Sequence, residues 1–222
     1  MLRQKIQKLA ERVLNISETE IEKTIRNRKI AYQNKFKEVK QKEKEVKEIV
    51  DEIEKLYDEW KNQVRRIPKD TANILSQEVI VKIKEIKAQY LEEVLNQLIE
   101  RYEEKKYSTV TLGLLISLLL NRTVSQYIKE EMEKGKELKQ IEPLNVNLNT
   151  KKLKNPISLL GYENQEKSYL RITGNAGAWT AYFMKGGRLI IDGKVKGFSL
   201  SAFSQNNKGE IWYQGKKIWP QS

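Results

Sequence analysis

The chain has 222 residues, with 42 basic and 30 acidic side chains, a formal net charge of +12, and neither cysteine nor histidine. The absence of both residue types excludes disulfides, zinc and haem sites, cysteine or serine–histidine nucleophiles, and the usual proton shuttle near neutral pH. Charged residues make up 32% of the chain and aromatic residues 8%, which predicts a lean core under a largely charged surface.

The positive charge is densest toward the end of the chain. Residues 1–140 hold 30 basic and 25 acidic side chains, whereas residues 141–222 hold 12 and 5. Such a surplus attracts nucleic acid, anionic lipid or an acidic partner protein, or it merely keeps the chain soluble.

The first residues and the residue usage bear on location and source. The stretch Met1–Lys8 is charged throughout and lacks the apolar run of a secretory signal. Together with the lack of cysteine, this predicts a cytoplasmic protein. Abundant lysine, glutamate and isoleucine without cysteine also indicate a thermophilic source.

Residues 1–140 are predicted to be a helical domain, built as a coiled coil or bundle. The capping-box pattern at 17–20 predicts the start of a long helix that ends near Ile67-Pro68. Charged residues fill the d positions of its first half, so this half is predicted to fray or to be where another molecule docks. Apolar residues recur every seven positions along the helix, at Ile25, Tyr32, Val39, Val46, Ile53, Trp60 and Ile67.

A second helix is predicted from Asp70 to about Lys106, and it is the natural antiparallel partner of the first. The two helices form either a hairpin within the chain or a coiled coil between chains, and both arrangements can coexist in a bundle. The apolar stripe of the second helix consists of Ile74, Ile80, Ile83, Ile86, Tyr90, Val94, Leu98 and Tyr102, widened by Leu91 and Leu95.

The most apolar stretch is Val110–Leu120, which is too short to cross a bilayer because a spanning helix needs about 20 residues. A helix that is apolar all round is expected to be buried on every side, as the centre of a bundle or as an oligomer contact. Its candidate packing residues are Leu112, Leu115 and Leu119. A charged continuation is predicted to end near Gly135 or Pro143, and the helices together predict a homo-oligomer.

Residues 141–158 are predicted to be a linker, because asparagine and the prolines Pro143 and Pro156 favour irregular backbone. Three lysines, Lys151, Lys152 and Lys154, lie just before the next domain.

Residues 159–222 are predicted to be a small β-solenoid of about three rungs. Three short apolar runs end at Gly174, Gly193 and Gly215, which are 19 and 22 residues apart. In a solenoid the strands are parallel, Ile172 stacks on Ile191, and Gly174 and Gly193 both take φ > 0 at equivalent corners. The alternative is an antiparallel meander. The predicted structural glycines are Gly174, Gly177, Gly187, Gly193, Gly197, Gly209 and Gly215.

The segment from Gly174-Asn175-Ala176-Gly177 through Phe183–Gly193 resembles the repeat of the GXGXG domain. This domain occurs in the large subunit of glutamate synthase and in one of the subunits of formylmethanofuran dehydrogenase. The resemblance covers about residues 169–215 and implies a right-handed β-helix with a structural role and no catalytic residues. The run Ile191–Gly197 also resembles the bactofilins.

Two sets of charged residues are candidate sites. The acidic run of residues 51–59 on the first long helix is either a hard-cation site or a solvated face. The basic residues of the C-terminal part, interleaved with aromatic residues, are candidate anion or nucleic-acid contacts. The alternative is that the aromatic residues fill and cap the solenoid core while the lysines solvate it. The candidate contacts are Lys151, Lys152, Lys154, Arg188, Lys194 and Lys196.

The sequence therefore predicts an α+β, non-enzymatic structural or assembly protein that oligomerises through its helices and contacts a partner through a basic β-solenoid head. The alternative is a nucleic-acid-associated protein. Neither a nucleotide fingerprint nor a catalytic constellation occurs in the sequence, so no cofactor, metal or small-molecule substrate is expected.

Overall fold

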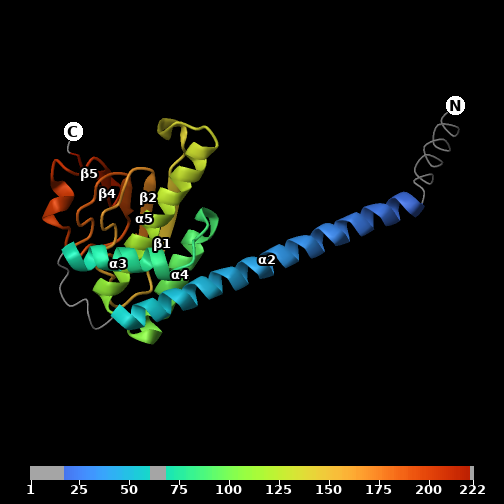
Figure 1. Cartoon of the computed structure of the whole chain (residues 1–222), viewed down its shortest axis with the longest axis horizontal. Helices are drawn as coiled ribbons and strands as arrows, with labels where there is room; N and C mark the ends of the chain where they lie inside the picture. Colours follow the sequence, from blue (N-terminus) through green and yellow to red (C-terminus); the bar gives the residue numbers. More distant parts are fainter. Residues whose placement is uncertain (1–17, 61–68, 221–222) are drawn as a thin grey trace, which may run out of the picture. The chain divides into compact units, whose positions relative to one another are not determined.

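The computed structural model describes the backbone of residues 18–60 and 69–220, and the side chains of residues 23–60 and 73–220. Helices precede strands along the chain, so the predicted α+β class is confirmed (Figure 1). The chain divides into two units, residues 1–45 and 46–222. The boundary between them falls within helix α2 (Glu18–Trp60).

Helix α2 carries the seven-residue repeat, but the repeat is buried only in the second unit. There Val46, Ile53 and Trp60 each expose at most 8% of their surface. In the first unit, 61% of Ile25 and 75% of Tyr32 is exposed. The predicted cap at residue 17 and the predicted helix end at 67–68 lie outside the described residues.

The predicted second helix is two helices, α3 (Lys69–Lys82) and α4 (Ala88–Lys105). Helix α3 ends where Arg122 Nη1 donates hydrogen bonds of 2.8 Å to the carbonyl oxygens of Val79 and Ile83. The carbonyl of Ile83 thereby gains a donor, and the carbonyl of Val79, which also accepts from the amide of Ile83 at 3.2 Å, gains a second one. Ile83 and Ile86 are buried although they lie in the non-helical link between α3 and α4. Apolar residues spaced as in a helix can therefore also be buried by an irregular segment.

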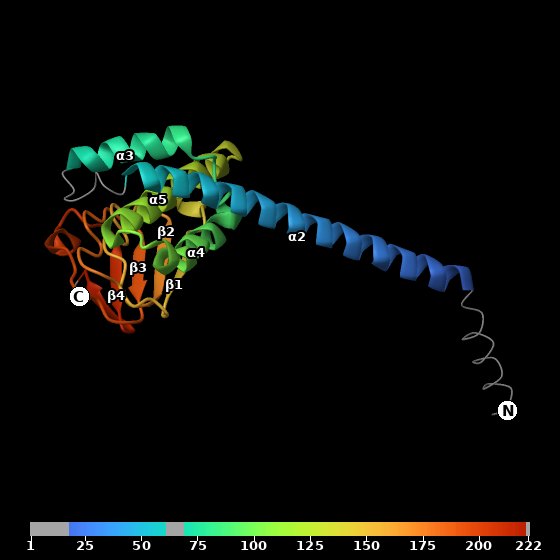
Figure 2. The same cartoon turned by 90° about the horizontal axis from the view of Figure 1, so that it is seen from below.

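Helix α5 (Thr109–Glu133) contains the most apolar stretch of the chain and is central to the second unit. Ser108 caps its first turn by accepting a hydrogen bond from the amide of Thr111. Residues 111–120 are all buried, including Leu112, Leu115 and Leu119. The helix packs against α3, α4 and the sheet, and Figure 2 shows it between α3 and the strands.

The C-terminal sheet is a β-solenoid, as the sequence predicts. The strands are β1 (Leu144–Thr150), β2 (Ser168–Gly174), β3 (Arg188–Ile191), β4 (Glu210–Tyr213) and β5 (Lys216–Trp219). They are neighbours in chain order, and the first four are parallel. Ile172 pairs with Ile191 in register, which confirms the predicted stacking and rules out the meander. Their side chains are buried in a core that is continuous with the helices.

The structure differs from the predicted linker at residues 141–158, because this range contains β1. Val146, Leu148 and Thr150 point into the core, while the asparagines between them are exposed. The solenoid therefore begins at Leu144 and packs directly on α4 and α5. The helices of the second unit and the solenoid form one compact body, in place of the separate domains predicted with boundaries at 140 and 159.

Helix α4 covers the open edge of β1 with side chains that imitate a neighbouring strand. Asn147 N donates to Glu92 Oε2 at 2.8 Å, and Asn96 Nδ2 donates to Asn147 O at 2.8 Å. Asn149 N donates to Asn96 Oδ1, also at 2.8 Å. An uncovered edge is a template for pairing with other chains, so these bonds protect the first rung.

We expect Asn96→Ala to lower the free energy of unfolding by about 1 kcal/mol, because two strand groups lose their partner to water. Hydrogen exchange should become faster at the amide of Asn149, which loses its acceptor. The matched control is Glu100→Ala, one turn further along α4, whose exposed side chain receives no strand amide. Equal exchange at Asn149 in both variants would contradict the capping role.

The other end of the solenoid is closed by β5 and by aromatic side chains. Strand β5 is antiparallel to β4, to which it is joined by a turn at Gln214-Gly215 with φ values of 50° and 78°. The rings of Phe198 and Phe203 lie 5.5 Å apart, and the Phe203 and Trp219 rings lie 6.1 Å apart. Phe198 and Trp219 pack on the core and on the partly exposed Phe203. For Trp219 this is the capping role considered for the aromatic residues in the sequence.

The two corner glycines are required for different reasons. Gly174 has φ = +133°, as predicted. The prediction of positive φ at Gly193 is wrong, because this residue is constrained by space: a Cβ there would lie 2.2 Å from the carbonyl oxygen of Gly174. Gly197, also predicted to be structural, has neither a positive φ nor any atom within 4 Å of an added Cβ.

Candidate interaction surfaces

The outer face of the sheet carries arginines that are already neutralised. Arg171 on β2 makes a bidentate ion pair with Asp192, in which Nε lies 2.9 Å from Oδ2 and Nη2 lies 3.1 Å from Oδ1. This pair leaves little of the guanidinium for an external anion.

Arg188, a predicted anion contact, is part of a second network on the same face. Its Nε lies 2.8 Å from Glu210 Oε2, and its guanidinium stacks 4.6 Å from the centre of the Tyr169 ring. Glu210 also accepts hydrogen bonds from Lys217 and from the Trp212 indole. The pKa of the Glu210 carboxyl lies below its ordinary value, and the hydrogen bond from Lys217 is the largest cause of this shift.

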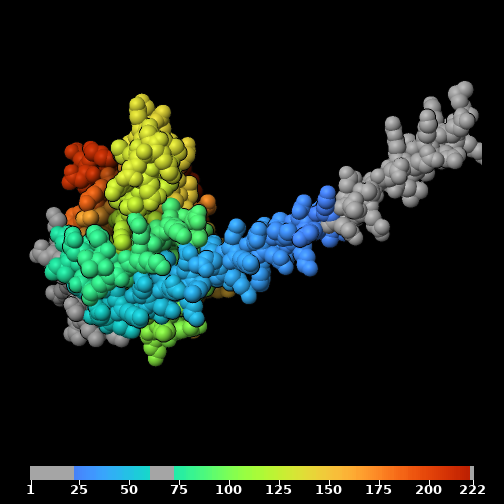
Figure 3. Space-filling model, turned by 45° about the vertical axis from the view of Figure 1, so that its right-hand side comes forward, coloured from blue at the N-terminus to red at the C-terminus, as the bar shows by residue number. Residues whose placement is uncertain are grey.

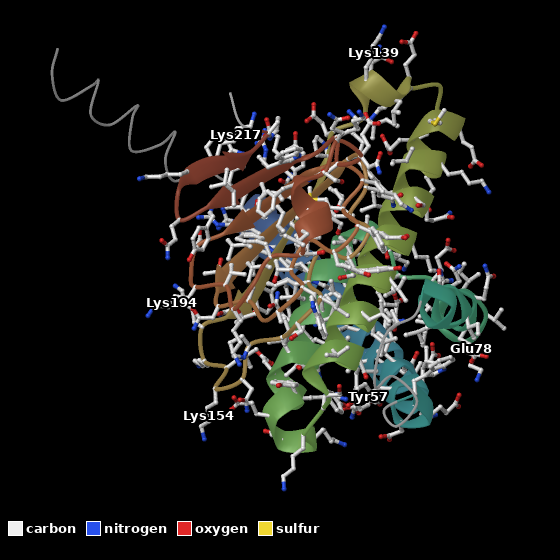
Figure 4. The ribbon with its side chains drawn as sticks, turned by 90° about the vertical axis from the view of Figure 1, so that its left-hand side faces the viewer. Tyr57, Glu78, Lys139, Lys154, Lys194 and Lys217 are labelled. Atoms are coloured by element: carbon white, nitrogen blue, oxygen red, sulfur yellow. The ribbon has the colours of Figure 1, made fainter. Side chains whose placement is uncertain are left out.

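The predicted lysine contacts lie elsewhere, in the turns that follow the carboxyl ends of the strands. We call this group the lysine edge. Backbone hydrogen bonds stack these turns: Gly193 N donates to Gly174 O, and Lys196 N donates to Ala176 O, both at 3.0 Å. Figure 4 shows Lys154 and Lys194 on the same side of the body. The lysine edge consists of the five predicted lysines, Lys151, Lys152, Lys154, Lys194 and Lys196, together with Lys216, which begins β5 directly after the turn that follows β4.

All six lysines of the lysine edge are exposed. Within the part of the chain that the structure describes, none of them forms an ion pair with a carboxylate. The structure thus brings five of the six predicted contacts together and separates Arg188 from them.

The acidic run on α2 holds the helices together. Arg101 Nη1 lies 3.0 Å from Asp51 Oδ1 and 2.9 Å from Glu54 Oε2, and Glu59 pairs with Lys82 of α3 at 2.6 Å. The described residues contain no cluster of three or more acidic side chains that could hold a metal ion. The run therefore joins α2 to α3 and α4, while Asp58 and Glu59 in it are also exposed to solvent.

Two tyrosines extend this helix-joining cluster to the start of α5. Tyr107 donates its hydroxyl proton to Glu54, and the backbone amide of Ser108 donates to the Tyr57 hydroxyl. Burial, followed by the bond to Glu54, raises the pKa of Tyr107. A phenol with a raised pKa stays protonated and serves as a donor, so this cluster is structural.

A groove of about 540 Å³ separates α4 from β1, and sequence reasoning missed it. Asn96 and Asn147 line it, and Glu103, which also lines it, accepts a hydrogen bond of 2.5 Å from the amide of Lys154. The polar groups of α4 thus face backbone groups of the first rung. No signal in the sequence distinguishes them from ordinary exposed helix residues.

A second cavity of about 490 Å³ lies between α3 and α5. Arg122 lines it, and burial lowers the pKa of this arginine. Its Nη1 donates hydrogen bonds to two carbonyl oxygens at the end of α3, so this arginine stabilises the end of that helix.

No protein-family model matches the chain, and no similar protein or solved structure was found in the comparisons. The resemblance to the GXGXG repeat therefore stays a prediction. Among the described helices, none has an apolar stretch long enough to pass through a bilayer.

Proposed function

We propose that this chain is a non-enzymatic assembly protein whose lysine edge holds an acidic partner protein. The observation that carries the proposal is the exposed lysine edge itself, which contrasts with the neutralised arginines on the adjoining face of the sheet. Because the turns repeat from rung to rung, they present several positive charges to one extended acidic segment.

The packing of the body supports this choice over an enzyme. The acidic and phenolic groups described above join helices or strands through their hydrogen bonds, as Glu54, Tyr107 and Glu210 do. We further propose that any oligomer forms through residues outside α5, because Leu112, Leu115 and Leu119 are already buried within the chain.

Nucleic acid is the second candidate partner of the lysine edge. The exposed indole of Trp179, 53% accessible, favours it because aromatic faces stack on bases. Against it, Phe198 and Tyr213 pack edge to face at 5.8 Å inside the solenoid end and are not presented to a ligand.

The test uses the full chain and two labelled probes, polyglutamate and a short duplex DNA, with binding followed by fluorescence anisotropy. We expect Lys194→Gln/Lys196→Gln to weaken polyglutamate binding by roughly tenfold, and added salt to weaken it further. The control of equal charge is Lys167→Gln/Lys208→Gln, which changes lysines before β2 and β4 and should have less effect.

Equal affinity of the two double variants for polyglutamate would contradict the proposal. Tighter binding of DNA than of polyglutamate, lost in the Lys194/Lys196 variant and steep in salt, would instead favour the nucleic-acid function.

A further inference from the structure

Residues 23–45 of α2 form an exposed and strongly basic helix within the first unit. They carry nine basic and three acidic side chains, a net charge of +6. Five large apolar side chains are also open to solvent: Ile25 is 61% exposed, Ile30 46%, Tyr32 75%, Phe36 52% and Val39 46%. In Figure 3 the side chains of this segment, in blue, are uncovered on the face in view.

Four of these residues, all but Ile30, share one face, which we call the α2 stripe. They follow one another at intervals of seven, four and three residues. At 3.6 residues per turn these intervals confine them to an arc of roughly 60°, along about 21 Å of helix. An apolar stripe of this kind needs an apolar medium to cover it.

Basic side chains border the α2 stripe on both sides. Arg28 and Lys35 border it on one side, and Lys29 and Lys40 border it on the other, at roughly 40–80° from its origin at Ile25. Lys40 Nζ lies 4.7 Å from the centre of the Phe36 ring. Of the three acidic residues, Glu38 and Glu45 point to the opposite side of the helix, at roughly 140–160°, whereas Glu43 follows Val39 by one turn and lies in line with Ile25.

This order, with apolar residues in the middle and basic residues at both borders along residues 25–40, matches the profile of an anionic bilayer surface. Long basic side chains reach back to phosphate groups while the apolar face enters the headgroup–acyl boundary. Basic residues near such a surface are attracted to it individually.

Other occupants fit this segment less well. Pairing with the same segment of a second copy would place two helices of net charge +6 side by side, and their repulsion opposes this pairing. Duplex nucleic acid would satisfy the lysines but leave the α2 stripe in water. A partner protein would need an apolar groove with an acidic rim, a combination that an anionic bilayer presents everywhere. We propose that residues 23–45 dock along the surface of an anionic lipid membrane through the α2 stripe.

The first experiment uses the lack of cysteine in the chain, which allows a label at one chosen site. Full-length Tyr32→Cys and Asn34→Cys variants carry an environment-sensitive fluorophore on opposite faces of the helix. With vesicles of phosphatidylcholine and phosphatidylglycerol, we expect a blue shift for the Tyr32→Cys variant only. Pure phosphatidylcholine vesicles should shift neither label. An equal shift at both sites, or with both vesicle types, would overturn the proposal.

The second experiment measures co-sedimentation of unlabelled protein with the same anionic vesicles. We expect Phe36→Ser to weaken binding by roughly tenfold, because a large apolar group leaves the membrane. The matched control is Ile30→Ser, an exposed residue on the far side of the helix, which should bind like the unmodified chain. Equal loss in both variants would count against a one-sided contact.

The competing occupants give distinct outcomes. A fall in molecular mass in Phe36→Ser, measured without lipid by light scattering, would show that a second copy covers the α2 stripe and would overturn the proposal. Loss of DNA binding in Phe36→Ser without loss of vesicle binding would overturn it too. Unchanged vesicle binding in the Lys194→Gln/Lys196→Gln variant would show that binding to the membrane does not depend on the lysine edge.

Discussion

Val46→Asp is expected to lower the free energy of unfolding of the body by about 3–5 kcal/mol, because it leaves an unpaired charge in an apolar contact. None of the Val46 surface is exposed, and Ile49 and Val50 beside it are exposed by no more than 3%. Ile53→Asp, one heptad further on and 1% exposed, should have an effect of the same size. Chemical denaturation of the full chain, followed by circular dichroism, measures both.

The matched control is Val39→Asp, which makes the same substitution at the same repeat position one heptad earlier. Val39 is 46% exposed, so the change should stay within about 0.5 kcal/mol. Equal destabilisation by Val39→Asp and Val46→Asp would show that the whole length of α2 is packed. Unchanged stability in the Val46 variant would show that the second half of α2 packs on nothing.

The contrast between Val39 and Val46 shows what the seven-residue repeat leaves open. The repeat is uniform along α2, so it predicts a packed face without saying where the packing stops. The intervening d positions carry that information: they are Ile49 and Leu56 in the buried half but Arg28 and Lys35 in the exposed half. Basic d positions thus accompany the half in which the repeat residues Ile25, Tyr32 and Val39 are exposed.

The solenoid shows a second limit, at its first rung. The run Leu144-Asn145-Val146-Asn147-Leu148 alternates with a period of two, which is a strand signal. Asparagine is rare in strands and common in turns, and Pro143 precedes the run. The composition therefore predicts an irregular linker, even though the period of two predicts a strand. The asparagines are tolerated because they point outward, where Asn147 bonds to Thr173 of β2 at 2.6 Å.

The anion contacts were predictable in part. The interval of 22 residues between Gly193 and Gly215 equals that between Arg188 and Glu210. Equivalent positions on successive rungs lie side by side, so this spacing already places the carboxylate beside the arginine. The cap from α4 was not predictable in this way, because Asn96 reaches β1 only through the packing of a helix onto the sheet edge.

Gly193→Ala is expected to cost about 2–3 kcal/mol of unfolding free energy, because the new methyl group meets backbone that has no room to give. Its Cβ would lie 2.2 Å from the carbonyl oxygen of Gly174, which also accepts the hydrogen bond from Gly193 N. Moving either strand end to relieve the clash would lengthen that bond and disturb the register of β2 with β3. Gly174→Ala should cost a similar amount for a different reason, since φ = +133° strains any side chain and its Cβ would lie 2.5 Å from Lys151 N.

The control for both variants is Gly197→Ala, in the same solenoid and only four residues from Gly193. No atom lies within 4 Å of a Cβ added there, and its φ is not positive. Alanine also restricts the unfolded chain more than glycine does, so stability should be unchanged or rise slightly, by up to about 1 kcal/mol. The measurement compares the denaturant midpoints of the Gly174→Ala, Gly193→Ala and Gly197→Ala chains. A Gly197→Ala chain as unstable as Gly193→Ala would mean that a general glycine effect, and not the close approach of two rungs, governs these corners.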